Sequence, residues 1–366
     1  GTIPDSIRSI SCGGFADVKS AKCPARHGDP HNDRGNQRMI VVTGGTGFIG
    51  SNLVAGLEDR GETDLVVCDR PGQVDKRRNI GKRELAALVI PEQLPEFLEG
   101  NAAKIRAVFH MGAISSTTET NEDLIVDTNV HLSADLWRWC AQNGVPFIYA
   151  SSAATYGDGS MGFYDDGSVE GLSRLRPMNP YGWSKQLFDR MVARWVDEGA
   201  PSPPQWVGLK FFNVYGPNEY HKGHMQSLVA KTFPVASAGD PVTLFRSHDP
   251  DYPDGGQMRD FVYVQDCVAV MLWLLDHPEI SGLFNLGTGQ ARTFMDLIGS
   301  MFAAMEMEPS LDWVDTPDEI RDRYQYFTQA EMGRLRAAGY DAPFLGVEEG
   351  VQDYVIRYLA TEDPYR

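Results

Sequence analysis

The sequence predicts an α/β fold: a doubly wound parallel sheet with a smaller lobe that is discontinuous along the chain. Two observations predict it. From Met39 onward, short apolar runs rich in β-branched residues alternate with amphipathic stretches. A glycine-rich turn at 43–50 joins the first apolar run to the first amphipathic stretch. Because strands and helices alternate, the expected sheet is parallel and has helices on both faces.

The expected elements follow in chain order. Residues 39–43 form the first strand, and Ile49, Leu53 and Leu57 have the spacing of a helix over 48–59. Further strands are expected at 65–69, 107–110, 146–150 and 206–212, and further helices at 181–197 and 347–359. Beyond Val214 the regularity loosens, and 248–257, which is rich in Asp, Pro and Gly, is an expected loop.

Composition excludes several classes of partner. The chain has 366 residues with 42% hydrophobic and 23% charged content, enough for a sizeable core. A formal net charge of −17 and a pI near 4.9 argue against nucleic acid or an anionic membrane surface as a partner. An anionic small molecule remains compatible, because local Arg and Lys outweigh a distant field that salt screens. The apolar run Val268–Leu275 is far too short to span a bilayer.

The five cysteines are scattered, with no C-x-x-C pair and no histidine at ligand spacing. They are Cys12, Cys23, Cys68, Cys140 and Cys267. We therefore expect no metal site and a reducing, cytoplasmic environment. Cys68 and Cys140 lie in apolar segments and are expected to be buried thiols.

Gly44, Gly47 and Gly50 have the G-x-x-G-x-x-G spacing of a dinucleotide-binding Rossmann turn. The first glycine allows a tight turn, the second lets backbone N–H groups approach a pyrophosphate, and the third lets helix pack on strand. Phe48 and Ile49 start the helix and are expected to contact the same cofactor. The alternative is an ordinary glycine-rich turn.

Asp69 ends the second expected strand, where an acidic residue binds the adenosine ribose of NAD. Cations follow it closely: Arg70, Lys76, Arg77 and Arg78. These could neutralise a 2′-phosphate, so the predicted cofactor is NADP, with NAD possible. The alternative is a solvated basic loop.

The sequence patterns divide the chain into three predicted regions. Residues 1–38 lack periodicity and are expected to be a disordered leader or a remnant of cloning. An NADP-binding domain is expected at 39–212 and about 257–283. A substrate-binding lobe is expected at about 213–256 and 284–366.

The predicted catalytic residues combine a serine with a Tyr-x-x-x-Lys pair. Ser151 and Ser152 follow a buried strand, so their hydroxyls are expected at the carboxyl edge of the sheet, where ligands bind. Tyr181 and Lys185 are four residues apart and share one face of a helix. The lysine charge is expected to lower the tyrosine pKa, so that the tyrosine takes a proton from a substrate alcohol while a nicotinamide takes the hydride. Alternatively, the pair could be surface helix residues.

The whole set of motifs resembles the extended short-chain dehydrogenase/reductase family, and within it the ADP-L-glycero-D-manno-heptose 6-epimerases. The similar segments are 109–119, 149–157, 212–217, 221–223, 259–264, 284–289 and 326–330. The resemblance implies a bacterial cytoplasmic enzyme of lipopolysaccharide core synthesis, using tightly held NADP. It implies oxidation of the C6″ alcohol of ADP-heptose to a ketone and return of the hydride to the opposite face. It also suggests a homo-oligomer, in particular a pentamer.

The resemblance also assigns residues. Lys222 in His-Lys-Gly is the implied second acid/base, although a phosphate contact from a loop is an alternative role. The implied cofactor contacts include Met111, Gly112, Ala113, Ile114, Ser115 and Val214. The implied substrate contacts are Ser116, Asn213, His224, Lys231, Phe245, Arg246, Ser247, His248, Arg259 and Tyr324. Arg259 is the preferred diphosphate clamp, because a guanidinium binds phosphate with two hydrogen bonds; for each cation, a surface pairing with Asp or Glu is the alternative.

Other functions compete with this interpretation. A related nucleotide-sugar epimerase or an NADP-dependent reductase would carry the same motifs. A dehydratase is disfavoured, because those relatives place an Asp-Glu pair where this chain has Ala153 and Ala154. A non-catalytic NADP-sensing module is disfavoured by the presence of Tyr181 and Lys185.

Overall fold

A seven-stranded parallel sheet forms the centre of the computed structural model, which describes residues 39–70, 72, 74–116, 119, 121–321 and 325–366. Along the sheet the strands are β10 (Gly282–Leu286), β6 (Trp206–Phe211), β5 (Phe147–Ser152), β4 (Ile105–His110), β1 (Met39–Thr43), β2 (Leu65–Cys68) and β3 (Ala87–Val89). All neighbouring strands in it are parallel. The order reverses at β1 and β4, so the predicted doubly wound sheet is confirmed.

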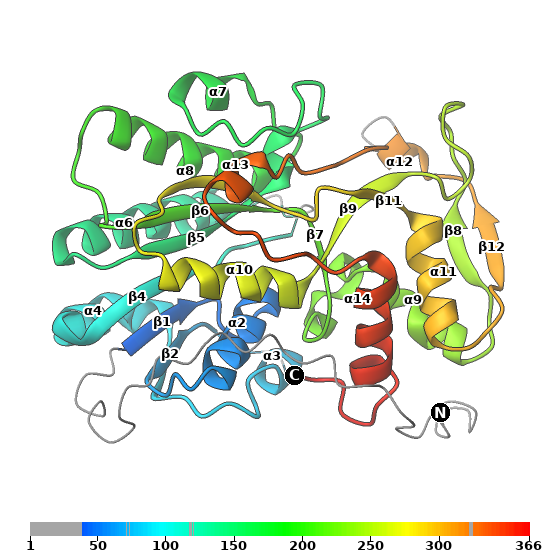
Figure 1. The fold of residues 1–366 in the computed structure, drawn as a ribbon, viewed down its shortest axis with the longest axis horizontal. Coiled ribbons are helices and arrows are strands. Elements are labelled where there is room, and N and C mark those ends of the chain that lie inside the picture. The colour runs from blue at the N-terminus through cyan, green and yellow to red at the C-terminus, as the bar shows by residue number, and fades with distance from the viewer. Residues whose placement is uncertain (1–38, 71, 73, 117–118, 120, 322–324) are drawn as a thin grey trace.

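Helices cover both faces of this sheet. The helices of the described chain are α2 (Phe48–Asp59), α3 (Val74–Arg78), α4 (Leu94–Asn101), α5 (Glu122–Val126), α6 (Leu132–Asn143), α7 (Val169–Arg174), α8 (Pro180–Asp197), α9 (Leu228–Ser237), α10 (Val264–Asp276), α11 (Phe294–Ala304), α12 (Asp318–Arg321), α13 (Gly333–Ala337) and α14 (Val347–Tyr354). Helices α2 and α10 lie on one face, and α6 and α8 on the other (Figure 1). Gly56 lets α2 approach α10, because a Cβ there would lie 2.4 Å from Val268 Cγ1. Trp137 and Trp195 join α6 to α8, with ring centroids 5.8 Å apart.

A second group of elements lies beyond the edge of the sheet, to the right in Figure 1. It holds the strands β11 (Ala291–Thr293), β9 (Met258–Tyr263) and β7 (Asn213–Tyr215), and the pair β12 (Leu311–Val314) and β8 (Val242–Phe245). Its own hydrophobic core packs α9, α11 and α14 around residues such as Phe261, Met301 and Tyr354. The division of the chain into two lobes, with the boundaries given above, stays a prediction.

Local signals explain where the elements near the site begin and end. Helix α8 starts at Pro180 because Asn179 caps it, its side chain accepting a hydrogen bond from Gly182 N. Strand β5 runs two residues further than expected, to Ser152. The expected helix at 347–359 changes after Tyr354 into a π-helical turn, Val355–Leu359.

The described chain contains no helix long and apolar enough to cross a membrane. Cys68 and Cys140 are buried free thiols, as predicted, and so is Cys267. Cys12 and Cys23 lie outside the described residues, together with the whole of the predicted leader.

Candidate active site

The glycine-rich turn lies where the order of the sheet reverses, between the carboxyl ends of β1 and β4. Gly44 has φ +67°, and a Cβ on it would lie 2.5 Å from Gly112 Cα in the loop after β4. A Cβ on Gly50 would lie 2.3 Å from Gly44 O. Both positions therefore require glycine. Gly47 is the N-cap of α2 without a side-chain cap, which leaves the start of the helix, Phe48 and Ile49 included, open to an anion.

Asp69 directly follows β2, and it lies beside the glycine-rich turn. Its Oδ2 accepts hydrogen bonds from Thr46 N (3.0 Å) and Thr46 Oγ1 (2.5 Å), and its Oδ1 lies 3.1 Å from Lys76 Nζ. Burial alone would raise the pKa of Asp69, but Lys76 and the Thr46 hydrogen bonds hold it below its ordinary value. Arg70 is exposed and pairs with Glu92. These residues fit a nucleotide ribose, with positive charge beside it.

The loop after β4 is held in place by a buried asparagine. Ile114 N donates to Asn129 Oδ1 (2.8 Å), and Asn129 Nδ2 donates to Ile114 O (3.0 Å) and to Ser184 Oγ of α8 (2.9 Å). This loop carries the predicted substrate contact Ser116 and five predicted cofactor contacts. The five cofactor contacts are Met111, Gly112, Ala113, Ile114 and Ser115, all half-buried except the exposed Ser115. The structure thus brings this loop beside the glycine-rich turn.

The two serines at the end of β5 point to different partners. Ser151 Oγ donates to Asp189 Oδ2 in the protein interior, at 2.6 Å. Ser152 is half-buried, accepts from Ala154 N (3.1 Å), and forms a hydrogen bond with the Tyr181 side chain. Ser152 is therefore the serine that faces the Tyr-Lys pair.

Tyr181 and Lys185 lie on one face of α8, as predicted, but their pKa values differ from the expectation. Burial raises the pKa of Tyr181 above its ordinary value; the hydrogen bond with Ser152 offsets part of the rise and the charge of Asp189 adds to it. The prediction that Lys185 lowers the tyrosine pKa was wrong for the net direction, because burial dominates. Burial also lowers the pKa of Lys185 to about 8, with Asp189 opposing the change.

Lys222 lies in a 3₁₀ turn, Tyr220–Met225, after β7. Its Nζ stands 5.0 Å from the centroid of the Phe48 ring, at the start of α2. Burial lowers the pKa of Lys222, the charge of Glu219 opposes this, and Lys231 lowers the pKa further. Lys231 is therefore a protein cation that acts on the pKa of Lys222.

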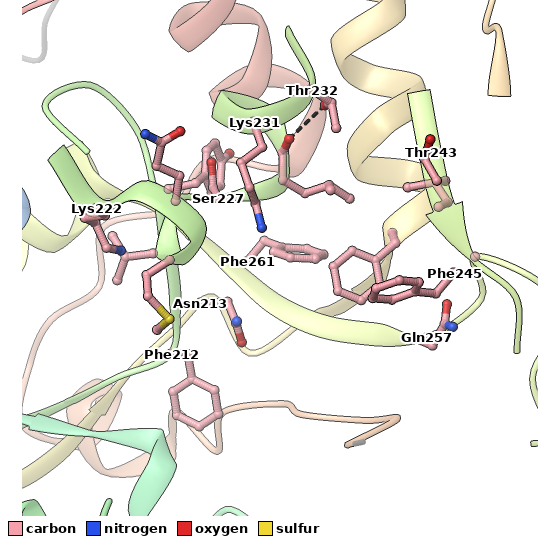
Figure 2. Close-up of a pocket in the computed structure, with 18 residues that line it drawn as sticks. Phe212, Asn213, Lys222, Ser227, Lys231, Thr232, Thr243, Phe245, Gln257 and Phe261 are labelled. Atoms are coloured by element: carbon pink, nitrogen blue, oxygen red, sulfur yellow. Dashed lines mark hydrogen bonds between the residues drawn. The ribbon is translucent and has the colours of Figure 1, made fainter. Parts of the chain in front are cut away.

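A cavity of about 580 Å³ opens beside Lys222, among the second group of elements. Predicted substrate or cofactor residues line it: Asn213, Val214, Lys222, Lys231 and Phe245. Figure 2 shows Asn213 and Lys231 pointing into it from different elements, and Phe261 of β9 also lines it. Tyr181, Lys185 and Ser152 are not among its lining residues, so the cavity suits the part of a ligand remote from the acid/base pair.

The other predicted substrate residues lie around β8 and β9. Arg246 is half-exposed and lies 3.5 Å from Asp254 and 3.9 Å from Asp315. Ser247 N donates to Asp254 Oδ1 (2.7 Å), and His248 N donates to the Tyr326 hydroxyl (2.9 Å).

Arg259 of β9 is buried, with its guanidinium 5.6 Å from the centroid of Phe294. His224 is exposed, and its carbonyl accepts from Lys231 Nζ at 3.3 Å. Tyr324 lies outside the described residues. The described contacts connect none of these residues to Tyr181.

Several residues of the site were not identified from the sequence. They are Thr46, Asn129, Asp189, Lys210 and Glu219. The available signal was a polar residue inside an otherwise apolar strand or helix, as for Lys210 in β6. Such a signal says that a buried partner exists but does not identify it.

The site combines a cradle for a dinucleotide with two groups that can transfer protons, Tyr181 and Lys222. The glycine-rich turn, the uncapped start of α2 and Asp69 form the cradle. Tyr181 and Ser152 can bind one hydroxyl group together, since they already share a hydrogen bond. Lys222 is a second, half-buried group with a lowered pKa, and it lies over Phe48 at the start of α2.

Comparison with known proteins agrees with this geometry. Residues 40–287 match the model of the NAD dependent epimerase/dehydratase family. The ADP-L-glycero-D-manno-heptose-6-epimerase of Nitratidesulfovibrio vulgaris (strain Hildenborough) is 48% identical over 329 residues, 89% of this chain and 100% of that protein. The protein of that name in Fusobacterium nucleatum is 45% identical over 335 residues, again 89% and 100%.

Solved structures give the same result. The Helicobacter pylori ADP-L-glycero-D-manno-heptose-6-epimerase superposes with a TM-score of 0.73 at 26% identity, covering 88% of this chain and 96% of its own. The Thermus thermophilus UDP-glucose 4-epimerase in complex with NAD gives 0.68 at 27% identity, covering 87% and 99%.

Proposed function

This chain belongs to the NAD dependent epimerase/dehydratase family, and from that membership we propose that it inverts one carbon of a nucleotide-linked heptose. The reaction converts ADP-D-glycero-β-D-manno-heptose into ADP-L-glycero-β-D-manno-heptose by transient oxidation at C6″. It supplies a precursor of the lipopolysaccharide core. Curated relatives that match nearly the whole chain carry this activity in their names.

One observation carries the mechanism: two separate half-buried groups suited to proton transfer lie beside the dinucleotide cradle. Tyr181 forms a hydrogen bond with Ser152 on one side. Lys222 stands over the Phe48 ring on the other. Inversion adds hydride to the opposite face of a ketone, so it requires an acid/base group for each orientation of the substrate. A dehydrogenase that works on one face needs only the first group.

The residues divide the reaction as follows. Ser152 holds the reacting hydroxyl, and Tyr181 removes its proton as the carbon is oxidised. A nicotinamide bound in the cradle would supply the acceptor for the hydride from that carbon and the donor for its return. Lys185, with its pKa lowered to about 8 by burial, keeps a positive charge near the tyrosine and binds the cofactor ribose. Lys222 exchanges the proton when the ketone presents its other face.

Recognition of the nucleotide diphosphate falls to the cavity beside β7 and α9. Lys231 and Asn213 point into it, and Phe245 and Phe261 give it apolar walls (Figure 2). Lys231 and Lys222 place two cations at this cavity on a protein whose net charge is −17. Arg259, buried against Phe294, is the guanidinium proposed to bind the phosphates.

NADP is the proposed cofactor. Lys76 lies 3.1 Å from Asp69, so the carboxylate charge that would repel a 2′-phosphate is balanced. Arg70 and Arg77 add exposed positive charge nearby. NAD is the alternative, favoured by the presence of Asp69 itself and by the NAD bound in the Thermus thermophilus relative.

Fluorescence titration of cofactor-free protein with NADPH and NADH decides between them. We expect the native chain to bind NADPH more tightly than NADH. Lys76→Ala should weaken NADPH binding by roughly tenfold or more, because the charge-assisted hydrogen bond from Lys76 to the 2′-phosphate contributes about 1.5–3 kcal/mol. NADH, which lacks that phosphate, should bind nearly as before. Lys82→Ala is the matched control, since Lys82 pairs with Asp363 instead. Tighter NADH binding by the native chain would refute the NADP proposal.

The epimerase proposal itself is tested by NMR of the purified protein with ADP-D-glycero-β-D-manno-heptose. Conversion to the L-glycero epimer should proceed without added reductant. If only a UDP-sugar turns over, the substrate is wrong. If NADPH is consumed in proportion to product, the protein is a reductase of the same family.

A homo-oligomer in the bacterial cytoplasm completes the proposal, with a pentamer as the expected form. Exposed apolar residues on α8 and just before it support self-association. They are Met178, Trp183 and Leu187, which line one surface pocket. Light scattering coupled to size exclusion measures the subunit number, and a monomer would contradict this part of the proposal.

A further inference from the structure

The face of α8 that carries Tyr181 and Lys185 continues into the protein interior. Asp189 follows Lys185 by four residues, so Tyr181, Lys185 and Asp189 occupy successive turns of one helix face. Asp189 is buried, and so is its partner Lys210 in β6, whose Nζ lies 2.8 Å from Asp189 Oδ2. Both side chains of this ion pair are 0% exposed.

Every hydrogen-bonding contact of this pair leads to the strand end that carries Ser152. Asp189 accepts from Ser151 Oγ (2.6 Å) and from the Tyr149 hydroxyl (3.1 Å), both in β5. Lys210 Nζ donates to Thr155 Oγ1 (2.6 Å), and Thr155 Oγ1 donates to the carbonyl of Ser152 (2.8 Å). Since Ser152 bonds Tyr181, the contacts form a closed circuit between α8 and β5.

Packing alone does not account for an ion pair at this place. Removing two charges from water is costly, and apolar residues of similar size commonly serve a buried position equally well. An ion pair with fixed hydrogen bonds orients the groups that it contacts and creates a local electrostatic field, and apolar residues do neither.

Among the ionisable groups around the pair, the charge of Asp189 is the one that acts on the pKa values of Tyr181 and Lys185. Tyr149 of β5 and Tyr156 of the turn 153–156 have pKa values raised well above the ordinary value, chiefly by burial, so both stay neutral. Burial lowers the pKa of His110 of β4 to about 3, so it is neutral too. The charge of Asp189 raises the pKa of Tyr181 and of Lys185, secondary to the effect of burial on each.

We propose that the buried Asp189–Lys210 ion pair is the positioning element of the acid/base pair: it fixes α8 against the strand end that carries Ser152, and its carboxylate sets the field at Tyr181 and Lys185. Asp189, Lys210 and Thr155 touch neither substrate nor cofactor in this role. They are positioning residues, and their role rests on the proposed function of Tyr181 and Lys185.

The test compares single and paired substitutions in the cofactor-loaded enzyme. Asp189→Asn and Lys210→Met each leave one buried charge without its partner, so both should lower the melting temperature. Asp189→Leu combined with Lys210→Met removes both charges and should recover most of that loss. In this double variant kcat should stay at least tenfold below native, with KM and NADPH binding within threefold of native.

The dependence of kcat on pH distinguishes an electrostatic effect of the ion pair on Tyr181 and Lys185 from a purely structural effect. Removing the Asp189 charge lowers the pKa of both Tyr181 and Lys185, so both inflections of kcat against pH should move to lower pH in the double variant. Thr155→Val cuts the link from Lys210 to Ser152 and keeps both charges. It should lower kcat severalfold without moving the profile.

Asp353→Asn is the matched control, because Asp353 accepts a hydrogen bond from Tyr263 (2.6 Å) in the other hydrophobic core. It should leave kcat and the profile native. Native kcat and an unmoved profile in the stable double variant would overturn the proposal, as would native kcat in Thr155→Val. Absence of heptose turnover by the native chain would instead refute the proposed function, while the melting temperatures would still report on the pair.

Discussion

Lys185, which is buried, and Lys222, which is half-buried, both have lowered pKa values, but they belong to differently built regions. Lys185 is the sixth residue of the 18-residue helix α8, which packs on the central sheet. Lys222 lies in a short 3₁₀ turn that contains Gly223 at φ +54°, a conformation that favours glycine. Burial lowers the pKa in both cases, and a carboxylate opposes it in both: Asp189 for Lys185 and Glu219 for Lys222.

The difference lies in what holds each lysine in place. Lys185 is fixed by regular backbone hydrogen bonds along α8. The turn of Lys222 is held by contacts with distant residues, among them those of the buried Glu219, which accepts from Ser227 Oγ at the start of α9 (2.7 Å) and from the Tyr354 hydroxyl of α14 (3.2 Å). The helix that carries Lys185 and the first acid/base group, Tyr181, is therefore part of the regular fold, whereas the second acid/base group, Lys222, is held by a few long-range contacts.

Tyr181→Phe should have the largest effect, because it removes the proton acceptor of the rigid region. General acid–base groups contribute roughly 10²–10⁴-fold, so we expect kcat to fall by about 10³-fold with NADPH binding within twofold of native. NMR progress curves and fluorescence titration measure the two quantities. Tyr164→Phe is the control, since Tyr164 is 63% exposed. Turnover within threefold of native would remove Tyr181 from the mechanism.

Lys222→Met should come next, with about a 100-fold loss of inversion. One epimer should still be oxidised in part, because Tyr181 and Ser152 remain. Product analysis by NMR together with the absorbance of reduced nicotinamide distinguishes the two steps. Lys231→Met, which changes another cation at the same cavity, should raise KM and change kcat only severalfold, because loss of the Lys231 charge raises the pKa of Lys222.

The alternative role of Lys222 gives the opposite pattern. If Lys222 only contacts phosphate, Lys222→Met will weaken cofactor or substrate binding and leave kcat intact. Its position over Phe48, beside the turn proposed to hold the pyrophosphate, makes this a direct alternative.

Glu219→Gln should have a smaller effect and tests the carboxylate that holds the second region. The charge of Glu219 raises the pKa of Lys222, so its removal lowers that pKa further. The inflection of kcat against pH that belongs to Lys222 should move to lower pH, with a change of severalfold in kcat near neutral pH. Glu348→Gln, which changes a surface carboxylate paired with Arg292, should leave the profile unchanged. An unmoved inflection in Glu219→Gln would contradict an electrostatic role for Glu219.

The contrast between local patterns and long-range contacts also explains which features could be predicted from the sequence. The glycine-rich turn and the Tyr181–Lys185 pair are local patterns, and the doubly wound sheet follows from alternating strands and helices, so these were predicted. The partners that hold them are distant in sequence: Lys210 and Asp189 are 21 residues apart, Asn129 and Ser184 are 55 apart, and Tyr354 and Glu219 are 135 apart. Hydrophobic periodicity shows that such polar groups are buried but does not say which distant group each one meets.

The tyrosine pKa shows the same limit. Charge spacing along α8 predicted a lowered value, whereas burial raises it. The degree of burial depends on the loops and strands packed over Tyr181, and spacing along one helix carries no information about them.

The central claim is that hydride leaves the inverted carbon and returns to the same carbon on its other face. Epimerisation of ADP-D-glycero-β-D-manno-heptose in D₂O, followed by NMR at C6″, tests it most directly. The account predicts an L-glycero product that carries no solvent deuterium at that carbon. Stoichiometric deuterium at C6″ would show inversion through loss of a proton to solvent, and would contradict the account.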